Sequence, residues 1–226
     1  MIAKRILDVI LAGSALICLA PLVLPVMLAL RLTGEGEIFY RQLRIGRGGV
    51  PFGILKFATM LKDSPNIAGG GISRRGDPRI LPLGHFLRST KINELPQLIN
   101  IIAGEMSIIG PRPLTPRTGD PYPPDHWAAM AHLRPGMSGV GSIVFLREED
   151  LLAHSANRLA FYRDVIVTHK SALERWYAAR VSVPLDVRLI ALTVAVVGRP
   201  GIDIHRFLLG LPPLPPILML ATRAGG

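Results

Sequence analysis

Basic side chains dominate the residues of this sequence that could do chemistry. The chain carries 26 lysines and arginines against 16 acids, a formal net charge of +10, so we expect an anionic partner. Many of the cations fall in turns and at the ends of expected elements, where they can converge on phosphate, which arginine binds with a planar fork of donors. They are Arg41, Arg44, Lys56, Arg74, Arg75, Arg79, Arg88, Lys91, Arg112 and Arg134.

Arg112 is the strongest candidate in this set. It lies in "GPRP", Gly110–Pro113, where two prolines stiffen the backbone and restrict the direction of the side chain. A rigidly presented arginine suits a pyrophosphate ligand. We therefore interpret Arg112 as a binding residue, and Arg74, Arg75 and Lys91 as parts of a solvated basic face.

Among the acids, Glu94 is the best candidate. We expect Asn93 to cap a helix over residues 93–103, and the N-terminal end of a helix favours an anion such as Glu94. Ordinary glutamates are also common at helix starts, so position alone favours a structural role. Asp77 and Glu105 are weaker candidates.

Several standard classes of site are excluded. The sequence holds no H-E-x-x-H motif, P-loop or G-x-S-x-G elbow. Its single cysteine, Cys18, rules out a zinc finger and an internal disulfide. Nucleic-acid binding is disfavoured because the chain has no recognised motif for it and only 6% aromatic residues.

The segment from Val9 to Leu30 is uncharged and could enter a membrane. As a helix it would be about 33 Å long, close to the thickness of a bilayer's hydrocarbon core. Pro21 and Pro25 favour a bent, re-entrant helix, as do the basic residues on both flanks, which prefer the cytoplasmic side. The residues alone leave a spanning and a re-entrant helix equally open.

The rest of the chain predicts short, mixed elements. Ile38–Leu43 and Phe52–Lys56 alternate around a glycine-rich turn and predict a β-hairpin. We expect helices over residues 80–88, 93–103, 127–133, 151–180 and 185–197, and a strand after the turn that begins at Arg134. Asp8 lies four positions after Lys4, so the two could pair along the first helix.

Six segments occur in one order and together resemble one family. They are "KRILDVILA", "RQLRIGRGG", "LKFATM", "LRSTKINELPQLINIIAGEMSIIGPRP", "LRPGMSGVGSI" and "WYAARVSVPLDVRLIALT". The family is the bacterial sugar transferases, the monotopic polyprenyl-phosphate phosphoglycosyl transferases. The resemblance extends to about residue 198, and the block ending in GPRP is the most specific part.

The resemblance implies an α+β fold, in which a re-entrant N-terminal membrane helix precedes a small, mostly helical cytoplasmic domain with a short β-hairpin. It implies a re-entrant helix over residues 1–33, a phosphoglycosyl transferase domain over 34–200 and an apolar, proline-rich tail over 201–226. The implied reaction moves a phosphosugar from a UDP-sugar to undecaprenyl phosphate and releases UMP. This reaction is the first membrane step of polysaccharide or glycan assembly.

The implied location is the cytoplasmic face of the bacterial inner membrane. The implied partners are the UDP-sugar donor, the undecaprenyl phosphate acceptor and the lipid bilayer, with no nucleic acid, and a homodimer is left open. The implied cofactor is Mg²⁺.

The resemblance also implies the site. In the family, an aspartate attacks the phosphoanhydride to form a covalent phosphosugar intermediate, and the glutamate after it helps to hold Mg²⁺. Here the pair is Asn93 and Glu94, so the glutamate is carried over and the nucleophile is not. By the same carry-over, the phosphate and nucleotide binders are Lys56, Arg88 and Arg112, with Arg44 and Arg134 behind them.

Asn93 leaves three outcomes, because a neutral amide oxygen is a far weaker nucleophile than a carboxylate. In the first, the chain is an inactive relative that serves as a membrane-bound binding or scaffold protein. Alternatively, Glu94 or the lipid phosphate attacks directly, or another carboxylate such as Asp77 approaches the site. We expect retained transferase activity, since the remaining substrate-binding motifs are intact.

Overall fold

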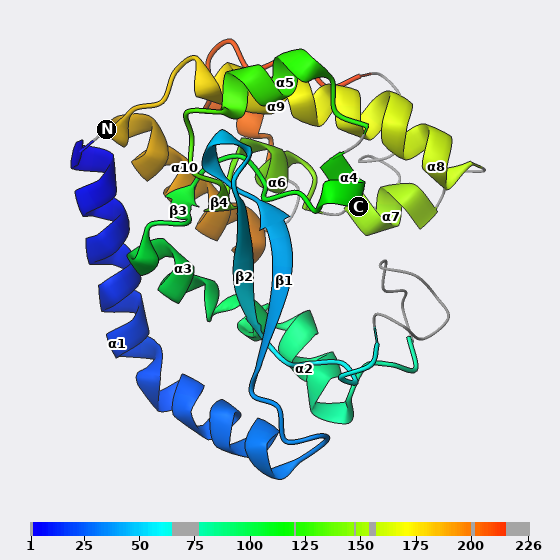
Figure 1. The fold of residues 1–226 in the computed structure, drawn as a ribbon. Coiled ribbons are helices and arrows are strands. Elements are labelled where there is room, and N and C mark those ends of the chain that lie inside the picture. The colour runs from blue at the N-terminus through cyan, green and yellow to red at the C-terminus, as the bar shows by residue number, and fades with distance from the viewer. Residues whose placement is uncertain are drawn as a thin grey trace. The chain divides into compact units, whose positions relative to one another are not determined.

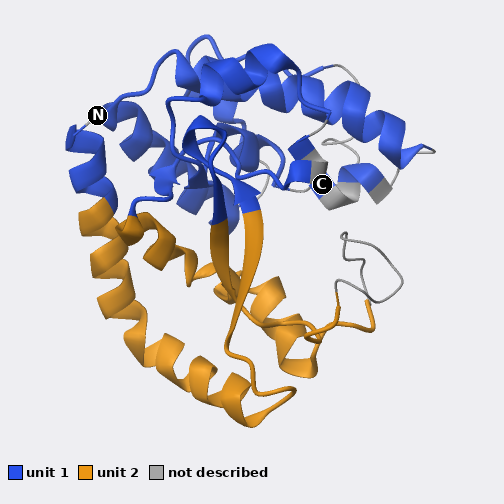
Figure 2. Ribbon diagram, viewed as in Figure 1, with its two compact units in different colours: residues 1–8, 44–52, 104–226 blue, residues 9–43, 53–103 orange. Residues whose placement is uncertain are grey.

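The structure is a computed structural model that describes residues 2–64, 77–119, 121–146, 148–153, 157–199 and 202–215 (Figure 1). The fold is α+β and mostly helical, as expected. The chain divides into two compact units (Figure 2): unit 1 holds residues 1–8, 44–52 and 104–226, and unit 2 holds residues 9–43 and 53–103. The Gly69–Gly71 loop, Arg74, Arg75 and the end of the apolar tail lie outside the described residues.

Unit 1 contains a small parallel sheet that the sequence did not predict. Strand β3 (Ser107–Ile109) pairs with β4 (Gly136–Ser138), so that Ser107 lies opposite Gly136 and Ile109 opposite Ser138. The helical elements of this unit are α4 (Pro116–Gly119), α5 (Pro124–Met130), α6 (Val140–Val144), α7 (Glu148–Ala153), α8 (Arg158–Phe161), the π-helix η3 (Tyr162–Val167), α9 (Thr168–Ala178), α10 (Val183–Gly198) and the 3-10 turn η4 (Ile204–Arg206).

The core of unit 1 is apolar and extends into the proline-rich tail. Ile109 of β3, Leu173 of α9 and Leu189 of α10 are almost completely buried in one cluster. Leu208 and Leu211, from the tail that the sequence left unassigned, are buried in the same cluster. The described part of the tail is therefore packed onto the core.

Unit 2 holds most of α1 (Ile2–Leu32), together with α2 (Pro82–Ser89), the 3-10 turn η2 (Ile92–Glu94) and α3 (Gln97–Ala103). In one buried cluster of this unit, Leu30 of α1 packs with Phe57 and Leu87.

The predicted β-hairpin is confirmed. Strands β1 (Phe39–Ile45) and β2 (Pro51–Phe57) pair with each other and are joined by the turn η1 (Arg47–Gly49). Gly48 and Gly49 take positive φ angles of 68° and 78°, which explains the glycine-rich turn. Each strand begins and ends within two residues of its predicted bounds.

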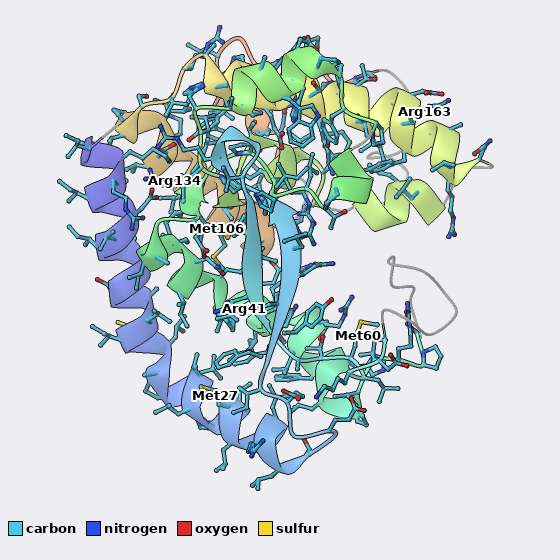
Figure 3. The ribbon with its side chains drawn as sticks, in the orientation of Figure 1. Met27, Arg41, Met60, Met106, Arg134 and Arg163 are labelled. Atoms are coloured by element: carbon cyan, nitrogen blue, oxygen red, sulfur yellow. The ribbon has the colours of Figure 1, made fainter. Side chains whose placement is uncertain are left out.

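Helix α1 is long and apolar enough to cross a membrane by length and composition. It continues through Pro21 and Pro25. Figure 3 shows that the axis of α1 changes direction before Met27. Each proline removes a backbone donor from the helix, which is a common cause of such a bend.

The predicted pairing of Lys4 with Asp8 is wrong. The Lys4 ammonium donates to Asp186 Oδ2 at 2.6 Å, and the Asp8 carboxylate accepts from the Ser107 hydroxyl at 2.8 Å and the Ile108 N–H at 2.9 Å. Both side chains are buried, so each uses a polar partner of the folded unit rather than its neighbour along the helix.

Three further expectations are corrected. The segment after Gly139 forms α6 instead of extending the strand, so β4 ends at Ser138. The long helix expected over residues 151–180 consists of α7 and, from Arg158, the continuous run α8–η3–α9. Asn93 does not cap a helix: it lies inside η2, and α3 begins only at Gln97.

Candidate active site

In unit 2, strand β2 and turn η2 bring together two of the predicted site residues. Lys56 is near the end of β2 and Glu94 is the last residue of η2. The Lys56 ammonium lies 3.4 Å from Glu94 Oε1, and both side chains are about a quarter exposed, at 22% and 31%. A partly buried acid beside a lysine can take up both a hard cation and a phosphate group.

The turn before Glu94 has an unusual backbone. Lys91, which precedes η2, has φ 60° and ψ 7°, a left-handed conformation that only a few per cent of non-glycine residues adopt. Arg88 is the second-last residue of α2, just before this turn, and the Thr90 N–H donates to Phe86 O at 3.1 Å. The predicted binder Arg88 and the predicted acid Glu94 therefore lie on either side of this left-handed residue.

Asn93 is buried within this turn, with 6% of its surface exposed. Among the described residues, its Oδ1 atom has no hydrogen-bond partner. A buried amide oxygen without a partner carries a desolvation cost that a ligand or cation could offset.

Asn100 is a supporting residue that the sequence analysis missed. Its Oδ1 accepts from the Leu55 N–H and its Nδ2 donates to Gly53 O, both at 2.9 Å. These bonds hold α3 against β2 next to Lys56. A signal was available, because Asn100 interrupts the apolar run of α3. In α3, Leu98 and Ile101 are buried, while Ile99 and Ile102 are exposed by 45% and 41%.

Asp77 is engaged elsewhere in unit 2. Its two carboxylate oxygens accept from the Arg79 guanidinium at 2.9 and 2.6 Å, and both side chains are buried. Both oxygens of Asp77 are therefore occupied by an arginine in this arrangement, which weakens its candidacy as a replacement nucleophile.

In unit 1, the GPRP segment is fixed by its own backbone. The Gly110 N–H donates to Ser138 O at 2.9 Å, and the Gly136 N–H donates to Pro111 O at 2.8 Å. A Cβ atom on Gly110 would lie 2.4 Å from Arg134 O, so the close approach to the β4 region requires glycine. The Arg112 side chain is exposed at the end of this fixed segment.

Arg44 and Arg134 bind backbone carbonyls in the same unit. Arg44 Nη1 donates to Pro113 O at 2.9 Å, and Arg134 Nε (Figure 3) donates to Gly104 O at 2.7 Å. Burial lowers the pKa of Arg134, with a further contribution from Arg5. Their roles as substrate binders stay predictions, while these contacts give both residues a structural role.

Behind Arg112 lies a buried acid, Glu174 of α9. Its Oε1 accepts from the Arg112 N–H at 3.0 Å, and its Oε2 lies 3.6 Å from His126 Nε2. Burial raises the pKa of Glu174 to about 7 and lowers the pKa of His126 to about 4. His126 is therefore neutral at pH 7, and its contact with Glu174 is not an ion pair.

A pocket of about 410 Å³ in unit 1 opens beside Arg112. Its walls are mostly apolar, and His126 contributes a buried Nδ1 atom that has no partner among the described residues. The lining residues are Ile45, Gly46, Gly48, Gly49, Pro111, Arg112, Leu114, His126, Trp127, Met130, Ala131, Leu133 and Pro135.

The described residues contain no group of three or more histidine, cysteine or acidic side chains that could hold a metal. Mg²⁺ commonly uses only one or two protein carboxylates and takes its other oxygen ligands from phosphate and water. Glu94 and the unpartnered Oδ1 of Asn93 fit such a sparse site.

The chain belongs to the bacterial sugar transferase family, whose model matches residues 1–200. A UDP-glucose:undecaprenyl-phosphate glucose-1-phosphate transferase of Caulobacter vibrioides is 41% identical over 64% of this chain and 54% of its own length. A protein of the same name from Xanthomonas campestris pv. campestris is 33% identical over 88% of this chain and 40% of its own length. An exopolysaccharide production protein of Rhizobium leguminosarum bv. phaseoli is 32% identical over 86% of this chain and 94% of its own length.

The chain thus spans about half or less of the length of the first two relatives. The third relative is matched along almost its whole length, which indicates that the shared region also occurs without a long additional part.

Proposed function

We propose that the chain transfers a phosphosugar from a UDP-sugar to undecaprenyl phosphate and releases UMP, as the first membrane step of polysaccharide or glycan assembly. The observation that carries this proposal is the Lys56–Glu94 pair, 3.4 Å apart and partly exposed, in a member of the sugar transferase family. Relatives with the printed name UDP-glucose:undecaprenyl-phosphate glucose-1-phosphate transferase support the donor and acceptor classes.

In this proposal the chain's residues bind and orient the reactants. Lys56 and Arg88 of unit 2 neutralise phosphate oxygens of the donor, and Glu94 would hold Mg²⁺, which would stabilise charge on those oxygens. Arg112 of unit 1 is a further predicted phosphate binder. The bond between the two donor phosphates breaks, UMP leaves, and the phosphorus that carries the sugar is bonded to the acceptor's phosphate oxygen. Because Asn93 is neutral, we propose that the lipid phosphate attacks the donor directly. In the alternative route Glu94 attacks first and forms an acyl phosphate, and the lipid phosphate then takes the phosphosugar and restores the carboxylate.

A second candidate function rests on Asn93 itself. An amide at the family's nucleophile position is what an inactive relative would carry. Such a protein would bind a UDP-sugar or polyprenyl phosphate at the membrane without turning it over.

Reconstitution distinguishes the two candidates. The purified chain is placed in lipid nanodiscs with undecaprenyl phosphate and Mg²⁺, and UMP release is measured from a panel of UDP-sugars. We expect release from one donor that requires both lipid and metal and falls strongly in a Glu94→Gln variant. No release from any donor, together with saturable binding of a UDP-sugar, would establish the binding protein instead.

We also propose that α1 is re-entrant, with both ends on the cytoplasmic face of the inner membrane. At its start, Lys4 and Asp8 bind residues beyond 104 in unit 1; at its end, Leu30 packs on Phe57 and Leu87 in unit 2. In the described part of the chain, α1 is the one helix long and apolar enough to cross a membrane. In this proposal the residues that follow α1 stay on one side of the membrane, and each end of the helix contacts some of them.

A further inference from the structure

Glu174 is a buried carboxylate that the proposed chemistry does not use. It lies on α9 with 3% of its surface exposed. Burying an acid is costly unless its oxygens gain good partners, and an apolar side chain of similar size would often be tolerated at least as well. The position therefore invites the question of what its oxygens do.

One oxygen of Glu174 binds the backbone of Arg112, the predicted phosphate-binding residue. Oε1 accepts from the Arg112 N–H at 3.0 Å. Because Pro111 and Pro113 have no N–H, this amide is the one backbone donor between Gly110 and Leu114. The hydrogen bond to Glu174 therefore uses the single backbone N–H of residues 111–113.

The neighbouring backbone groups are held as well. Pro111 O accepts from the Gly136 N–H at 2.8 Å, and Pro113 O accepts from Arg44 at 2.9 Å. Arg112 thus sits between two anchored carbonyls, and Glu174 fixes the amide between them. Its exposed side chain starts from a backbone that is bound on both sides and in the middle.

Glu174 is in turn confined by its surroundings. A Cβ atom on Gly141 would lie 3.2 Å from Oε1, so glycine at that position leaves room for the carboxylate. Oε2 faces His126 Nε2 at 3.6 Å. Lys170, one turn earlier on α9, is paired with Glu148, which leaves Glu174 for the Arg112 amide.

We infer that Glu174 is a positioning residue for Arg112. Its carboxylate fixes the backbone of the GPRP segment, so that the Arg112 guanidinium is presented to a phosphate group of the substrate. This inference rests on the proposed function for the identity of the ligand, and on the contacts above for the positioning.

The Arg112 amide offers a test that does not depend on activity. Hydrogen exchange is followed by mass spectrometry in peptides that cover residues 110–114, in the full chain in nanodiscs. We expect Glu174→Leu to speed exchange of the Arg112 amide about tenfold or more, and Glu174→Gln to leave it nearly unchanged, because glutamine keeps the acceptor oxygen. The matched control is Glu148→Leu, which alters a carboxylate of the same unit that contacts Lys170. An Arg112 amide that exchanges equally in the Leu and Gln variants would overturn the inference.

Kinetics test whether the positioning matters for catalysis. We expect Glu174→Leu to lower kcat/KM for the UDP-sugar about tenfold and Glu174→Gln to restore it to within about threefold of the wild type. On an Arg112→Ala background, Glu174→Leu should cause no further loss, since Glu174 acts through Arg112. Losses that simply add would overturn the inference.

The outcomes separate the inference from the proposed function. A wild-type chain without turnover contradicts the proposed function, while amide exchange still decides the role of Glu174. Where the Leu variant fails to fold, Glu174→Asp replaces it. The shorter aspartate should lengthen the bond to Arg112, giving faster exchange than Glu174→Gln; equal exchange would contradict the inference.

Discussion

The chemistry proposed for this chain depends most on Asn93. The motif resemblance predicts that it occupies the family's nucleophile position next to Glu94, and it is buried in a turn in which Lys91 has a left-handed backbone conformation. Residues in such sparsely populated conformations persist only where the surrounding structure enforces them, and they are frequent at functional sites. The backbone of this turn therefore has a feature that is frequent at functional sites, although an amide stands where a nucleophile is expected.

We expect Asn93→Asp to raise the rate of UMP release at least about tenfold, because a carboxylate attacks phosphorus far better than an amide oxygen. In the absence of undecaprenyl phosphate, intact mass spectrometry should detect a phosphosugar covalently bound to the variant. Asn93→Ala serves as the control: it removes the amide oxygen without adding a carboxylate, so it should give neither the rate increase nor the adduct. An Asn93→Asp chain with an unchanged rate and no adduct would show that the covalent route is closed for other reasons.

Glu174 should also make stability depend on pH. Burial raises its pKa in the folded chain from 4.5 to about 7, so the folded state binds this proton more tightly than the unfolded state. The free energy of unfolding should therefore fall as pH rises from about 4.5 to about 7, by on the order of 3 kcal/mol from this group. Arg112 and Lys170 oppose the shift, and neighbouring His126, with a pKa of about 4, stays neutral over most of this range.

The measurement compares the melting temperature of the wild type with that of Glu174→Gln from pH 5 to pH 7.5. Because glutamine has no proton to lose, the variant should gain on the wild type by several degrees across this range. Parallel curves for the two proteins would show that the Glu174 carboxyl does not titrate there.

The sequence predicted some site residues better than others, for a physical reason. Lys56 and Glu94 were chosen for their charge and motif, and the fold brings them within 3.4 Å. Asn100 was missed because its role is to bind backbone groups of a strand about 45 residues earlier, which no local pattern reveals. The hydrogen bond from the Arg112 N–H to Glu174, 62 residues away, could not be predicted from the sequence for the same reason.

At the scale of elements, local signals were sufficient where an element is long or has a distinct turn. The hairpin and α10 were predicted because alternation around glycines and a sustained apolar run depend on neighbouring residues alone. The β3–β4 sheet was missed because each strand has three residues and the two lie 29 positions apart. Similarly, Val140–Val144 resembles a strand in composition but forms a helix, since tertiary context overrides weak propensity.

The approach of α2 to the segment after β2 depends on a glycine. A Cβ atom on Gly84 would lie 2.2 Å from Thr59 O, which accepts from the Leu81 N–H at 3.0 Å. We expect Gly84→Ala to destabilise the chain by about 2 kcal/mol or more, because backbone on both sides must shift. Thermal unfolding of the variant checks this, with Gly198→Ala as control, since nothing lies within 4 Å of that added carbon. Equal melting temperatures would show that α2 can move away without cost.

At the scale of the whole molecule, the N-terminal helix combines two properties that rarely coexist. Its most apolar stretch has a mean hydropathy of 2.5 and is only 6% buried, yet Lys4 and Asp8 at its start are almost fully buried in polar contacts. Lys4 also donates to Ile109 O at 2.8 Å. A 31-residue helix would reach about 46 Å if straight, which is enough to cross a bilayer. The buried contacts of Lys4 and Asp8 and the two prolines are the features on which the proposed re-entrant path rests.

Cysteine labelling tests this topology directly. In a Cys18→Ser background, single cysteines are placed at Ile2 and Thr33, and a membrane-impermeant maleimide is applied to sealed vesicles of either orientation. We expect both positions to react only in vesicles that expose the cytoplasmic face, as Ser89→Cys on α2 should. Labelling of Ile2→Cys from the opposite face would show that α1 spans the membrane, and that the Lys4 and Asp8 contacts do not form in the bilayer.

Replacing Pro21 and Pro25 together by leucine restores both backbone donors. If the prolines cause the helix to return to the cytoplasmic face, this variant should move Ile2→Cys towards the opposite face.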